Sequence, residues 1–517
     1  MLRRLATHLP GLLLLGACAV TPAPTPTPPS ADPAAVVEVE IGEPPPLQRE
    51  FRGVWVASVA NIDWPSRRDL SSAQQQAELL AILDRAVALN LNAVIFQVRP
   101  GGDALYASPH EPWSEYLTGR MGRAPEPFYD PLEFAVREAH RRGLELHAWF
   151  NPYRARHPSA RSEVSANHLS RTRPELVRSY GKHLWMDPGE AAVREHTLRV
   201  ILDVVQRYDI DGVHIDDYFY PYRERDAAGR EIPFPDGPSW SRYVASGGRL
   251  SRNDWRRHNV DLLVEQLYEA IKQEKPWVKF GISPFGIWRP GYPAQIRGLD
   301  AYHEIYADAR KWLVNGWLDY FTPQLYWPIA QTPQSYPVLL DWWVGQNQHG
   351  RHIWPGNFTS RVGEGTWSAG EILGQIHVTR GQGGATGNVH FSMRALMQNR
   401  DSLFDRLSLE AYAEPALPPP TPWLGEGPPT APAVTLQYDT SLGQDLLTLD
   451  PTDQLPPAWW VVHTRYTEGW KTEILPGWHR THRLTASVDS GAPLAVAVSG
   501  VDRNGNEGPL LVLRSSR

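Results

Sequence analysis

The chain has 517 residues, too many for one ordinary hydrophobic core, so we expect at least two domains. Its 57 Asp and Glu outnumber its 51 Lys and Arg, and the net charge of −6 without a dense basic run argues against nucleic acid as a partner. The 21 Trp and 20 Tyr favour a carbohydrate ligand instead, because flat aromatic faces stack on sugars, although a large core accounts for a share of them.

The first 18 residues have the pattern of a bacterial lipoprotein signal. Two arginines precede an apolar segment, residues 9–15, that is too short to span a bilayer, and the sequence LGAC ending at Cys18 resembles a lipobox. The resemblance implies cleavage before Cys18, the single cysteine, and anchoring to the lipid bilayer through acyl chains on it. Because Ala19 is not Asp, we expect the outer membrane, on its periplasmic side, if the host is Gram-negative. An ordinary secretory signal is the alternative.

The chain that follows predicts a tether and then an α/β domain. Residues 19–47 are rich in Pro, Ala and Thr without a hydrophobic period, which indicates an extended tether. Between residues 48 and 412, strand-like runs alternate with helical ones in eight units, which predicts a (β/α)8 TIM barrel. The predicted strands are residues 51–58, 92–100, 144–152, 212–221, 279–286, 320–328, 353–358 and 387–393.

The connections between these strands carry local signals. Ser72 and Gln75 form a capping-box pattern ahead of apolar residues at helical spacing, so the first helix is predicted to start there. Residues 101–130 and 222–250 are long, polar connections that follow the second and fourth predicted strands. Loops of this length are typically functional or disordered, and we expect these two to form the walls of a substrate cleft.

The C-terminal part predicts a separate small module. Residues 413–429 are rich in Pro and indicate a stiff linker. Residues 430–517 hold short strand-like runs divided by turn signals, which predicts a small all-β sandwich similar to fibronectin type III modules. No catalytic group of residues is recognisable in this part, so we expect a spacer or a weak binding module.

The fourth predicted strand carries the acidity that sugar cleavage requires. It reads DGVHIDDYFYP and places Asp216 and Asp217 where a parallel barrel presents its C-terminal rim to substrate. The later predicted strands end without a carboxylate, and Asp319 lies at the opposite end of the sixth. Glycosidases ordinarily use two carboxyl groups at the scissile bond. Asp216 and Asp217 are therefore the predicted catalytic pair.

Two adjacent carboxyls without a third on another strand suit substrate-assisted cleavage of N-acetylhexosaminides. There the 2-acetamido oxygen of the substrate attacks the anomeric carbon, one acid protonates the leaving group and the other orients the amide. We assign Asp217 as the acid and Asp216 as the orienting carboxylate. Mutual repulsion raises one pKa of such a pair, as a general acid at neutral pH requires. The alternative for either residue alone is an ion pair with a rim arginine such as Arg99 or Arg154.

Polar and aromatic residues on neighbouring strands are expected around this pair, although each alone is as compatible with core packing. The candidates for substrate contact are Gln97, Arg99, His147, Trp149, Asn151, His214, Tyr218, Trp288, Gln324, Tyr326 and Trp327. Tyr326 is expected to donate to the acetamido oxygen, and Trp149, Trp288 or Trp327 to form the floor of the sugar site. We expect His147 and His214 to be hydrogen-bonded histidines of the barrel and expect neither a metal nor a cofactor.

Six strings in the predicted barrel resemble a known family. They are FRGVWVAS, NAVIFQVRP, LHAWFNPYR, DGVHIDDYFYP, GISPFGIWR and DYFTPQLYW, and in this order they are similar to the glycosyl-hydrolase-like family 10 of bacterial envelope proteins, which includes the divisome-localised glycoside hydrolase. The resemblance covers residues 49–407 and implies a TIM-barrel hydrolase acting on peptidoglycan glycan strands without stem peptides, hence GlcNAc-MurNAc substrates. The pair Asp216 and Asp217 falls on the acidic motif of the family.

Three functions follow as hypotheses. The first is a lipid-anchored glycosidase of peptidoglycan strands. The second is a metal-dependent polysaccharide deacetylase with His147, His214 and Asp216 as ligands, which a chelator would inactivate. The third is a glycan-binding envelope lipoprotein without catalysis, which would generate no new reducing ends.

Overall fold

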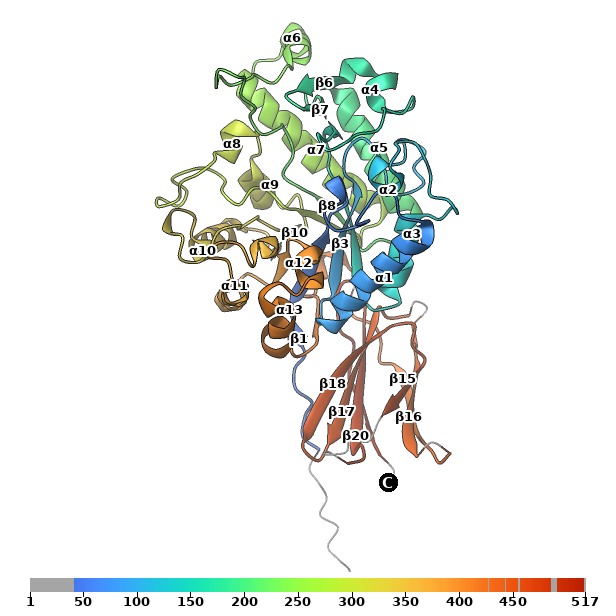
Figure 1. Cartoon of the computed structure of the whole chain (residues 1–517). Helices are drawn as coiled ribbons and strands as arrows, with labels where there is room; N and C mark the ends of the chain where they lie inside the picture. The colour runs from blue at the N-terminus through green and yellow to red at the C-terminus, as the bar shows by residue number, and fades with distance from the viewer. Residues whose placement is uncertain (1–40, 426, 442, 454–455, 485–490, 516–517) are drawn as a thin grey trace, which may run out of the picture. The chain divides into compact units, whose positions relative to one another are not determined.

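The structure is a computed structural model that describes residues 41–517 apart from 426, 442, 454–455, 485–490 and 516–517 (Figure 1). The predicted signal peptide with Cys18 and most of the predicted tether lie outside these residues. The contacts divide the chain into two units, of which the second, Glu43–Arg517, contains both the α/β domain and the C-terminal sheets. Within the described ranges, no helix is long and apolar enough to cross a bilayer.

A nine-stranded parallel sheet is the centre of the α/β domain, in the order β11-β10-β9-β8-β4-β3-β2-β13-β12. Every predicted strand contains one of its strands, and the seventh also overlaps β11. Their bounds are β2 Phe51–Val56, β3 Ala93–Arg99, β4 Glu145–Phe150, β8 Gly212–Ile215, β9 Lys279–Ile282, β10 Tyr320–Phe321, β11 His352–Ile353, β12 Gly356–Asn357 and β13 Gly387–His390. The strand residues are buried, as expected for a parallel sheet covered by helices.

The two edge strands, β11 and β12, belong to one short segment of the chain. Trp354 donates its backbone N–H to Phe321 on one side of this segment, and Pro355 accepts from the backbone of Val389 on the other. Proline has no N–H to continue a ladder, which interrupts the predicted seventh strand at this point. The sheet therefore curls until both of its ends meet, and the fold is α/β and TIM-barrel-like.

Helices follow the strands and cover the outside of the sheet (Figure 1). Their bounds are α1 Ser72–Ala88, α2 Glu115–Thr118, α3 Pro131–His140, α4 Leu169–Thr172, α5 Ala191–Arg207, α6 Gly237–Ala245, α7 Arg252–Glu274, α8 Ala301–Glu304, α9 Ala309–Asn315, α10 Tyr336–Gln346, α11 Ala369–Gly381, α12 Met393–Met397 and α13 Leu403–Arg406. The capping box of α1 is formed by Ser71 and Gln74, one residue before the predicted pair, because the sequence repeats both serine and glutamine.

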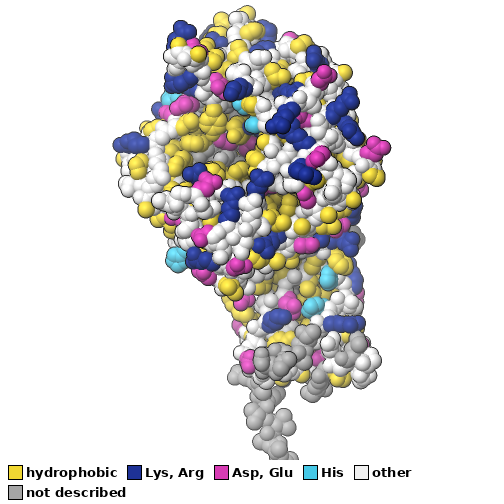
Figure 2. Space-filling view, in the orientation of Figure 1, with side chains coloured by type: hydrophobic (Ala, Val, Ile, Leu, Met, Phe, Trp, Pro, Cys, Tyr) yellow, Lys and Arg dark blue, Asp and Glu magenta, His cyan; other side chains and the backbone are white. Residues whose placement is uncertain are grey.

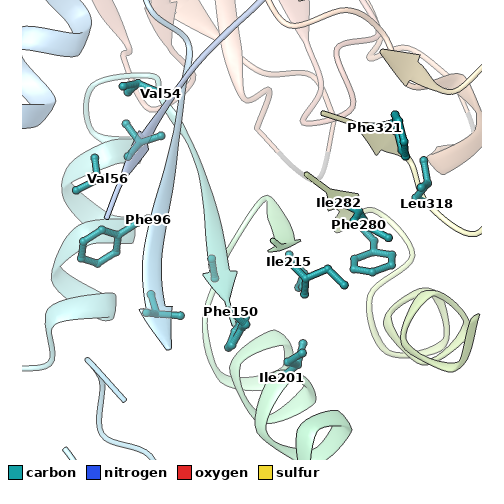
Figure 3. Close-up of a cluster of buried hydrophobic side chains, with 14 of the residues drawn as sticks. Val54, Val56, Phe96, Phe150, Ile201, Ile215, Phe280, Ile282, Leu318 and Phe321 are labelled. Atoms are coloured by element: carbon teal, nitrogen blue, oxygen red, sulfur yellow. The ribbon is translucent and has the colours of Figure 1, made fainter. Parts of the chain in front are cut away.

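Two apolar cores hold this domain. The larger packs strand side chains such as Phe96, Phe150 and Phe280 against helix side chains such as Ile201 (Figure 3). The smaller fills the inside of the curled sheet, where the rings of Phe51 and Trp354 stack with centroids 3.6 Å apart. The interior is thus a packed core rather than a pore, and substrate has access only at an end of the strands.

A small antiparallel sheet extends the chain beyond β4. It has the order β5-β7-β6, with β5 Arg154–Arg156, β6 Val177–Tyr180 and β7 His183–Met186. β5 begins four residues after β4 ends, so this sheet is fixed close to the C-terminal end of the main strands.

The C-terminal part consists of two antiparallel sheets. One has the order β15-β16-β19, with bounds Ala433–Asp439, Gln444–Asp450 and Thr481–Leu484, and the other the order β18-β17-β20-β21, with bounds Gly469–Pro476, Trp459–Tyr466, Ala495–Val501 and Leu511–Arg514. Leu447 and Leu449 of the first sheet pack with Trp460, Val462 and Val498 of the second. The likeness to fibronectin type III modules stays a prediction.

The Pro-rich segment before these sheets is packed against the α/β domain. Its strand β14, Ala416–Leu417, pairs in parallel with β1, Gln48–Arg49, and is buried. Trp423 donates its indole N–H to Asp319 at 2.9 Å, at the N-terminal end of β10. Further along, Trp459 of β17 donates to the backbone carbonyl of Gly143 at 2.7 Å. The C-terminal sheets are therefore connected to the end of the barrel that lies opposite the predicted catalytic pair.

Candidate active site

A cavity of about 240 Å³ opens at the C-terminal ends of the main strands. Strand ends supply Trp55, Ala57, Gln97, Trp149, Asp216, Asp217, Ser283 and Gln324, and the segments beyond them supply Val59, Ala60, Ile62, Arg154, His157, Tyr218, Tyr326, Phe358 and Phe391. Asp216 and Asp217 are its only carboxyl groups among the described residues, and each is 4 % exposed. The chain turns directly after β8, which brings both adjacent side chains to the cavity.

Asp216 is held by donors from the neighbouring strand β4. Trp149 donates its indole N–H to one carboxylate oxygen at 3.1 Å, and Asn151 donates its amide N–H to both oxygens at 3.1 and 3.2 Å. The Asn151 oxygen accepts the backbone N–H of Arg154 at 2.9 Å, which fixes the orientation of the amide. Burial, with the charge of Asp217, raises the pKa of Asp216 to about 7, although the Arg154 charge opposes this.

Asp217 has partners of a different kind. It accepts a hydrogen bond from the Tyr222 hydroxyl, which follows it by five residues. Burial raises the pKa of Asp217, and the hydrogen bonds from Tyr222 and Gln324 act in the opposite direction. Two buried carboxyls next to each other cannot both ionise freely, so one proton stays with the pair near neutral pH.

The cavity also presents polar groups that are free to bind a ligand. The Gln97 oxygen accepts the backbone N–H groups of Ser58 and Val59 at 3.0 and 2.9 Å, which leaves its buried amide nitrogen without a partner. Tyr326 lines the same cavity, and its ring stacks on Phe358 with centroids 4.6 Å apart. Together with Trp149, these side chains combine flat apolar surface with hydrogen-bond donors, as a sugar site requires.

Comparison with known proteins places this arrangement in a family. The profile of the family described as "Glycosyl hydrolase-like 10" matches residues 50–368, which include every cavity-lining residue except Phe391. The chain belongs to this family. The sequence is 39 % identical to "Glycosyl hydrolase YngK" of Bacillus subtilis over 89 % of this chain and 92 % of that protein. It is 36 % identical to "Glycosyl hydrolase DigH" of Escherichia coli K12 over 66 % of this chain and 79 % of that protein.

The comparison with solved structures gives matches of low sequence identity. The glycoside hydrolase domain of PgaB (BpsB) from Bordetella bronchiseptica is 14 % identical, with a TM-score of 0.46 over 70 % of this chain and 99 % of that one. The catalytic domain of a β-amylase from Paenibacillus polymyxa is 12 % identical, with a TM-score of 0.45 over 68 % and 94 %. Membership of the glycosyl hydrolase-like 10 family confirms the resemblance seen in the sequence and the prediction of a glycosidase.

The residues predicted to contact substrate fall into three groups by their position relative to the cavity. Gln97, Trp149, Tyr218, Gln324 and Tyr326 line the cavity. Asn151 lies outside the lining and donates its amide N–H to Asp216. The remaining five, Arg99, His147, His214, Trp288 and Trp327, lie outside the lining.

Arg99 and the two tryptophans have other partners. Arg99 is fully buried and donates to Glu111 at 2.7 Å, so it forms no ion pair with the aspartates, whereas the charge of Arg154 acts to lower the pKa of both. Trp288 donates to Asp308 at 3.0 Å and stacks on Trp342. Trp327 packs edge-on against Phe285 with centroids 5.6 Å apart. Of the three tryptophans predicted as the floor of the sugar site, only Trp149 reaches the cavity.

His147 and His214 form a hydrogen-bonded column inside the barrel. His147 bonds Glu145 at 2.9 Å and the Tyr320 hydroxyl at 2.8 Å. His214 bonds the same hydroxyl at 3.0 Å and accepts the indole N–H of Trp55 at 3.2 Å. Burial holds the pKa of His214 well below its usual value, so its ring is neutral.

The described residues contain no group of three or more His, Cys, Asp or Glu side chains placed to hold a metal ion. The three side chains predicted as metal ligands of a deacetylase are bonded to other groups: His147 and His214 have the partners above, and Asp216 accepts from Trp149 and Asn151. The geometry therefore gives the metal-dependent alternative no support.

The walls of the cavity come from segments that sequence reasoning did not identify. Neither residues 101–130 nor residues 222–250 contribute to the lining, contrary to the expectation for the two long loops. The walls are Val59, Ala60 and Ile62, Arg154 and His157 in and beyond β5, and the aromatic rings of Phe358 and Phe391. These residues lie at or just after the ends of predicted strands. That position could have identified them from the sequence, because the loops at the C-terminal ends of barrel strands form the site.

Proposed function

We propose that this glycosidase cleaves N-acetylhexosaminide bonds in the glycan strands of bacterial peptidoglycan, by substrate assistance. The observation that carries the proposal is the pair Asp216 and Asp217, the only two carboxyls in the described lining, both from one strand end. A conventional nucleophile or base would come from the opposite side of the scissile bond. The acetamido oxygen of the substrate supplies the nucleophile instead, so no protein nucleophile is needed.

The hydrogen-bond partners support Asp217 as the proton donor and Asp216 as the orienting carboxylate. Trp149 and Asn151 can only donate to Asp216 through N–H groups, which favours its ionised form as the acceptor for the acetamido N–H. The Tyr222 hydroxyl can donate to ionised Asp217 or accept from the protonated acid. Asp217 can therefore release its proton to the leaving oxygen without leaving a buried group unpaired.

Tyr326 and Gln97 complete the proposed site. Tyr326 donates its hydroxyl to the acetamido oxygen, which aligns it for attack on the anomeric carbon. The unpaired amide nitrogen of Gln97 donates to a sugar hydroxyl, and Trp149 provides the apolar surface below the ring. The expected lipid anchor at Cys18 would keep the enzyme at the periplasmic side of the outer membrane, beside this substrate.

Purified glycan strands, before and after chemical removal of their N-acetyl groups, test the proposal. Mass spectrometry should detect new reducing ends with the acetylated strands, and cleavage of the deacetylated strands should be slower by at least about 100-fold, because the intramolecular nucleophile is missing. Equal cleavage of both would contradict substrate assistance. No cleavage of either would contradict hydrolysis of this glycan.

A further inference from the structure

Ser283 contributes a buried hydroxyl to the cavity. It follows β9 directly, lines the cavity and is 2 % exposed. Its hydroxyl oxygen lies 2.9 Å from Nε2 of His214 and has no other hydrogen-bond partner among the described residues. Gln324, which bonds Asp217, donates to the backbone carbonyl of Ser283 at 2.8 Å. Ser283 is therefore held close to the proposed catalytic pair.

The indole of Trp55 fixes the direction of the hydrogen bond between Ser283 and His214. An indole N–H can only donate, and Trp55 donates to the same Nε2 of His214 at 3.2 Å. Because burial keeps the pKa of His214 well below its usual value, the ring is neutral and has its single N–H proton on Nδ1. Nε2 cannot donate, so the Ser283 hydroxyl donates to it and keeps the lone pairs of its oxygen for another donor.

The other end of the histidine column requires the same direction. Lys279 is buried and can only donate, and it donates to Glu145 at 2.9 Å. Glu145 accepts from Nε2 of His147 at 2.9 Å, which leaves Nδ1 of His147 to accept the Tyr320 hydroxyl at 2.8 Å. The Tyr320 oxygen in turn accepts the Nδ1 proton of His214 at 3.0 Å. Both ends of the column thus place the proton of His214 on Nδ1.

A sugar bound in the cavity needs such an acceptor. Apolar side chains surround a hollow in the upper part of the face shown in Figure 2, and a sugar hydroxyl that enters an apolar surrounding loses its water partners. A hydroxyl both donates and accepts, so it needs an acceptor as well as donors such as the Gln97 amide. The proposed cleavage uses Asp216 for the acetamido N–H and Asp217 for the leaving oxygen. Ser283 supplies an acceptor that cleavage leaves free.

We propose that the Ser283 hydroxyl accepts a hydrogen bond from one free hydroxyl of the sugar in the cavity, and that His214 and Tyr320 are positioning residues that fix its direction. The proposal rests on the proposed function, and it adds a condition on the substrate: the N-acetylhexosamine in the cavity carries an unsubstituted hydroxyl at this position. An ether or ester at that oxygen removes the hydrogen that Ser283 accepts and adds atoms next to a buried side chain.

Binding of substrate analogues tests this contact independently of cleavage. The probe is an S-linked disaccharide of N-acetylglucosamine, which resists hydrolysis, with analogues in which each free hydroxyl in turn is replaced by hydrogen or by fluorine. Calorimetry with wild type should find one position at which both replacements weaken binding about tenfold, because neither hydrogen nor fluorine donates.

The variant Ser283→Ala should bind the parent disaccharide about tenfold more weakly and should no longer distinguish hydroxyl, hydrogen and fluorine at that position. Ser170→Ala is the matched control, since the Ser170 hydroxyl lies 2.8 Å from Nδ1 of the buried His168 outside the cavity lining. Its preference should equal that of wild type.

Two further measurements test the positioning residues. Tyr320→Phe removes only the oxygen between the two histidines, and it should lose part of the preference although Ser283 is intact. Nitrogen NMR of the histidine side chains should show the proton of His214 on Nδ1 in wild type. The signals of His214 are assigned by their absence in His214→Gln or by their change in Tyr320→Phe.

Three results would overturn the contact: no position at which Ser283→Ala removes a preference, fluorine that binds as well as the hydroxyl there, or a proton on Nε2 of His214. The full preference in Tyr320→Phe would overturn the positioning roles. A preference in binding without cleavage of glycan strands would instead overturn the proposed function and leave the contact standing.

Discussion

Asp216 and Asp217 are close enough to govern the ionisation of each other. Asp216 lies in a fully buried position, and its pKa of about 7 reflects burial first and the neighbouring carboxylate second. A carboxyl with a raised pKa keeps its proton as the pH rises toward that pKa and loses it above. The pair therefore holds the proton that cleavage needs below about pH 7, where Asp217 can donate it, and loses this proton as the pH rises further.

The pH dependence of kcat/KM on glycan strands should show this loss. Above about pH 7 the value should fall close to tenfold per pH unit, because the singly protonated pair is the active form. Rates measured between about pH 6 and pH 9 check the prediction. A flat profile over that range would indicate that proton donation comes from another group.

The two carboxyls should also respond differently to the leaving group. Asp217→Asn should retain substantial activity on an aryl glycoside whose phenol leaves without protonation, whereas Asp216→Asn should lose activity on glycan and aryl glycoside together. Parallel kinetics on both substrates make the comparison. The reverse pattern would exchange the two roles.

The sequence predicts the two carboxyls of the cavity but not most of the side chains around them. Asp216 and Asp217 are recognisable because a buried strand ends in two charged residues at a barrel rim. Arg154 and His157 reach the cavity only because the antiparallel sheet of β5, β6 and β7 forms after β4, and sequence spacing does not reveal that pairing. By residue type, Arg99 and Trp288 are as suitable for binding a sugar as the residues of the cavity. Their hydrogen bonds to Glu111 and Asp308 hold them outside the lining.

Among the elements, the turn between β20 and β21 forms the main polar contact of the C-terminal sheets with the barrel. Arg503 in this turn donates to Asp209 at 2.9 Å and lies 3.3 Å from Asp211, next to the start of β8. The charges of His140 and Arg503 and the surrounding hydrogen bonds hold the pKa of Asp211 well below its usual value, against burial. This contact is at the opposite end of β8 from the proposed catalytic pair.

Arg503→Ala should lower the free energy of unfolding by about 1–2 kcal/mol, the cost of removing one partner from a half-buried ion pair. Because the cavity lies at the other end of the strand, kcat should stay unchanged. Urea titration and steady-state kinetics measure the two effects, with the exposed Arg483→Ala as control. A loss of activity without a loss of stability would contradict a purely structural role of Arg503.

The order of the strands follows well from the sequence, and the exact ends of elements less well. All eight predicted strands occur because buried parallel strands are continuous apolar runs. Pro355 divides the predicted seventh strand into β11 and β12. Ser71 and Ser72 are both suitable N-caps for α1 by residue type, and the structure shows that Ser71 is the one used. Neither detail has a distinct signal in the residue pattern.

Over the whole molecule, the α/β domain and the C-terminal sheets are joined by contacts from several parts of the chain. β14 pairs with β1, Trp423 bonds Asp319, and Trp459 bonds the backbone of Gly143. The Pro-rich composition of residues 413–429 alone indicated a linker, and only the fold shows its pairing with a segment more than 360 residues earlier. Such contacts couple the unfolding of both parts.

Scanning calorimetry should therefore show one cooperative transition for the whole chain rather than two. The reason is that unfolding either part exposes the buried contacts of the other. Removing residues 430–517 should lower the melting temperature of the remaining barrel. Two well-separated transitions in the intact chain would contradict the coupling.

Both carboxyls of the proposed site come from one strand end, and two single substitutions test whether they are catalytic. Rates of glycan-strand cleavage should be measured for Asp216→Asn, Asp217→Asn and the exposed control Asp69→Asn, with melting temperatures taken in parallel. Each cavity variant should lose cleavage by at least about 100-fold while it stays folded, and the control should cleave normally. Cleavage at the wild-type rate by either cavity variant would show that its carboxyl is not catalytic.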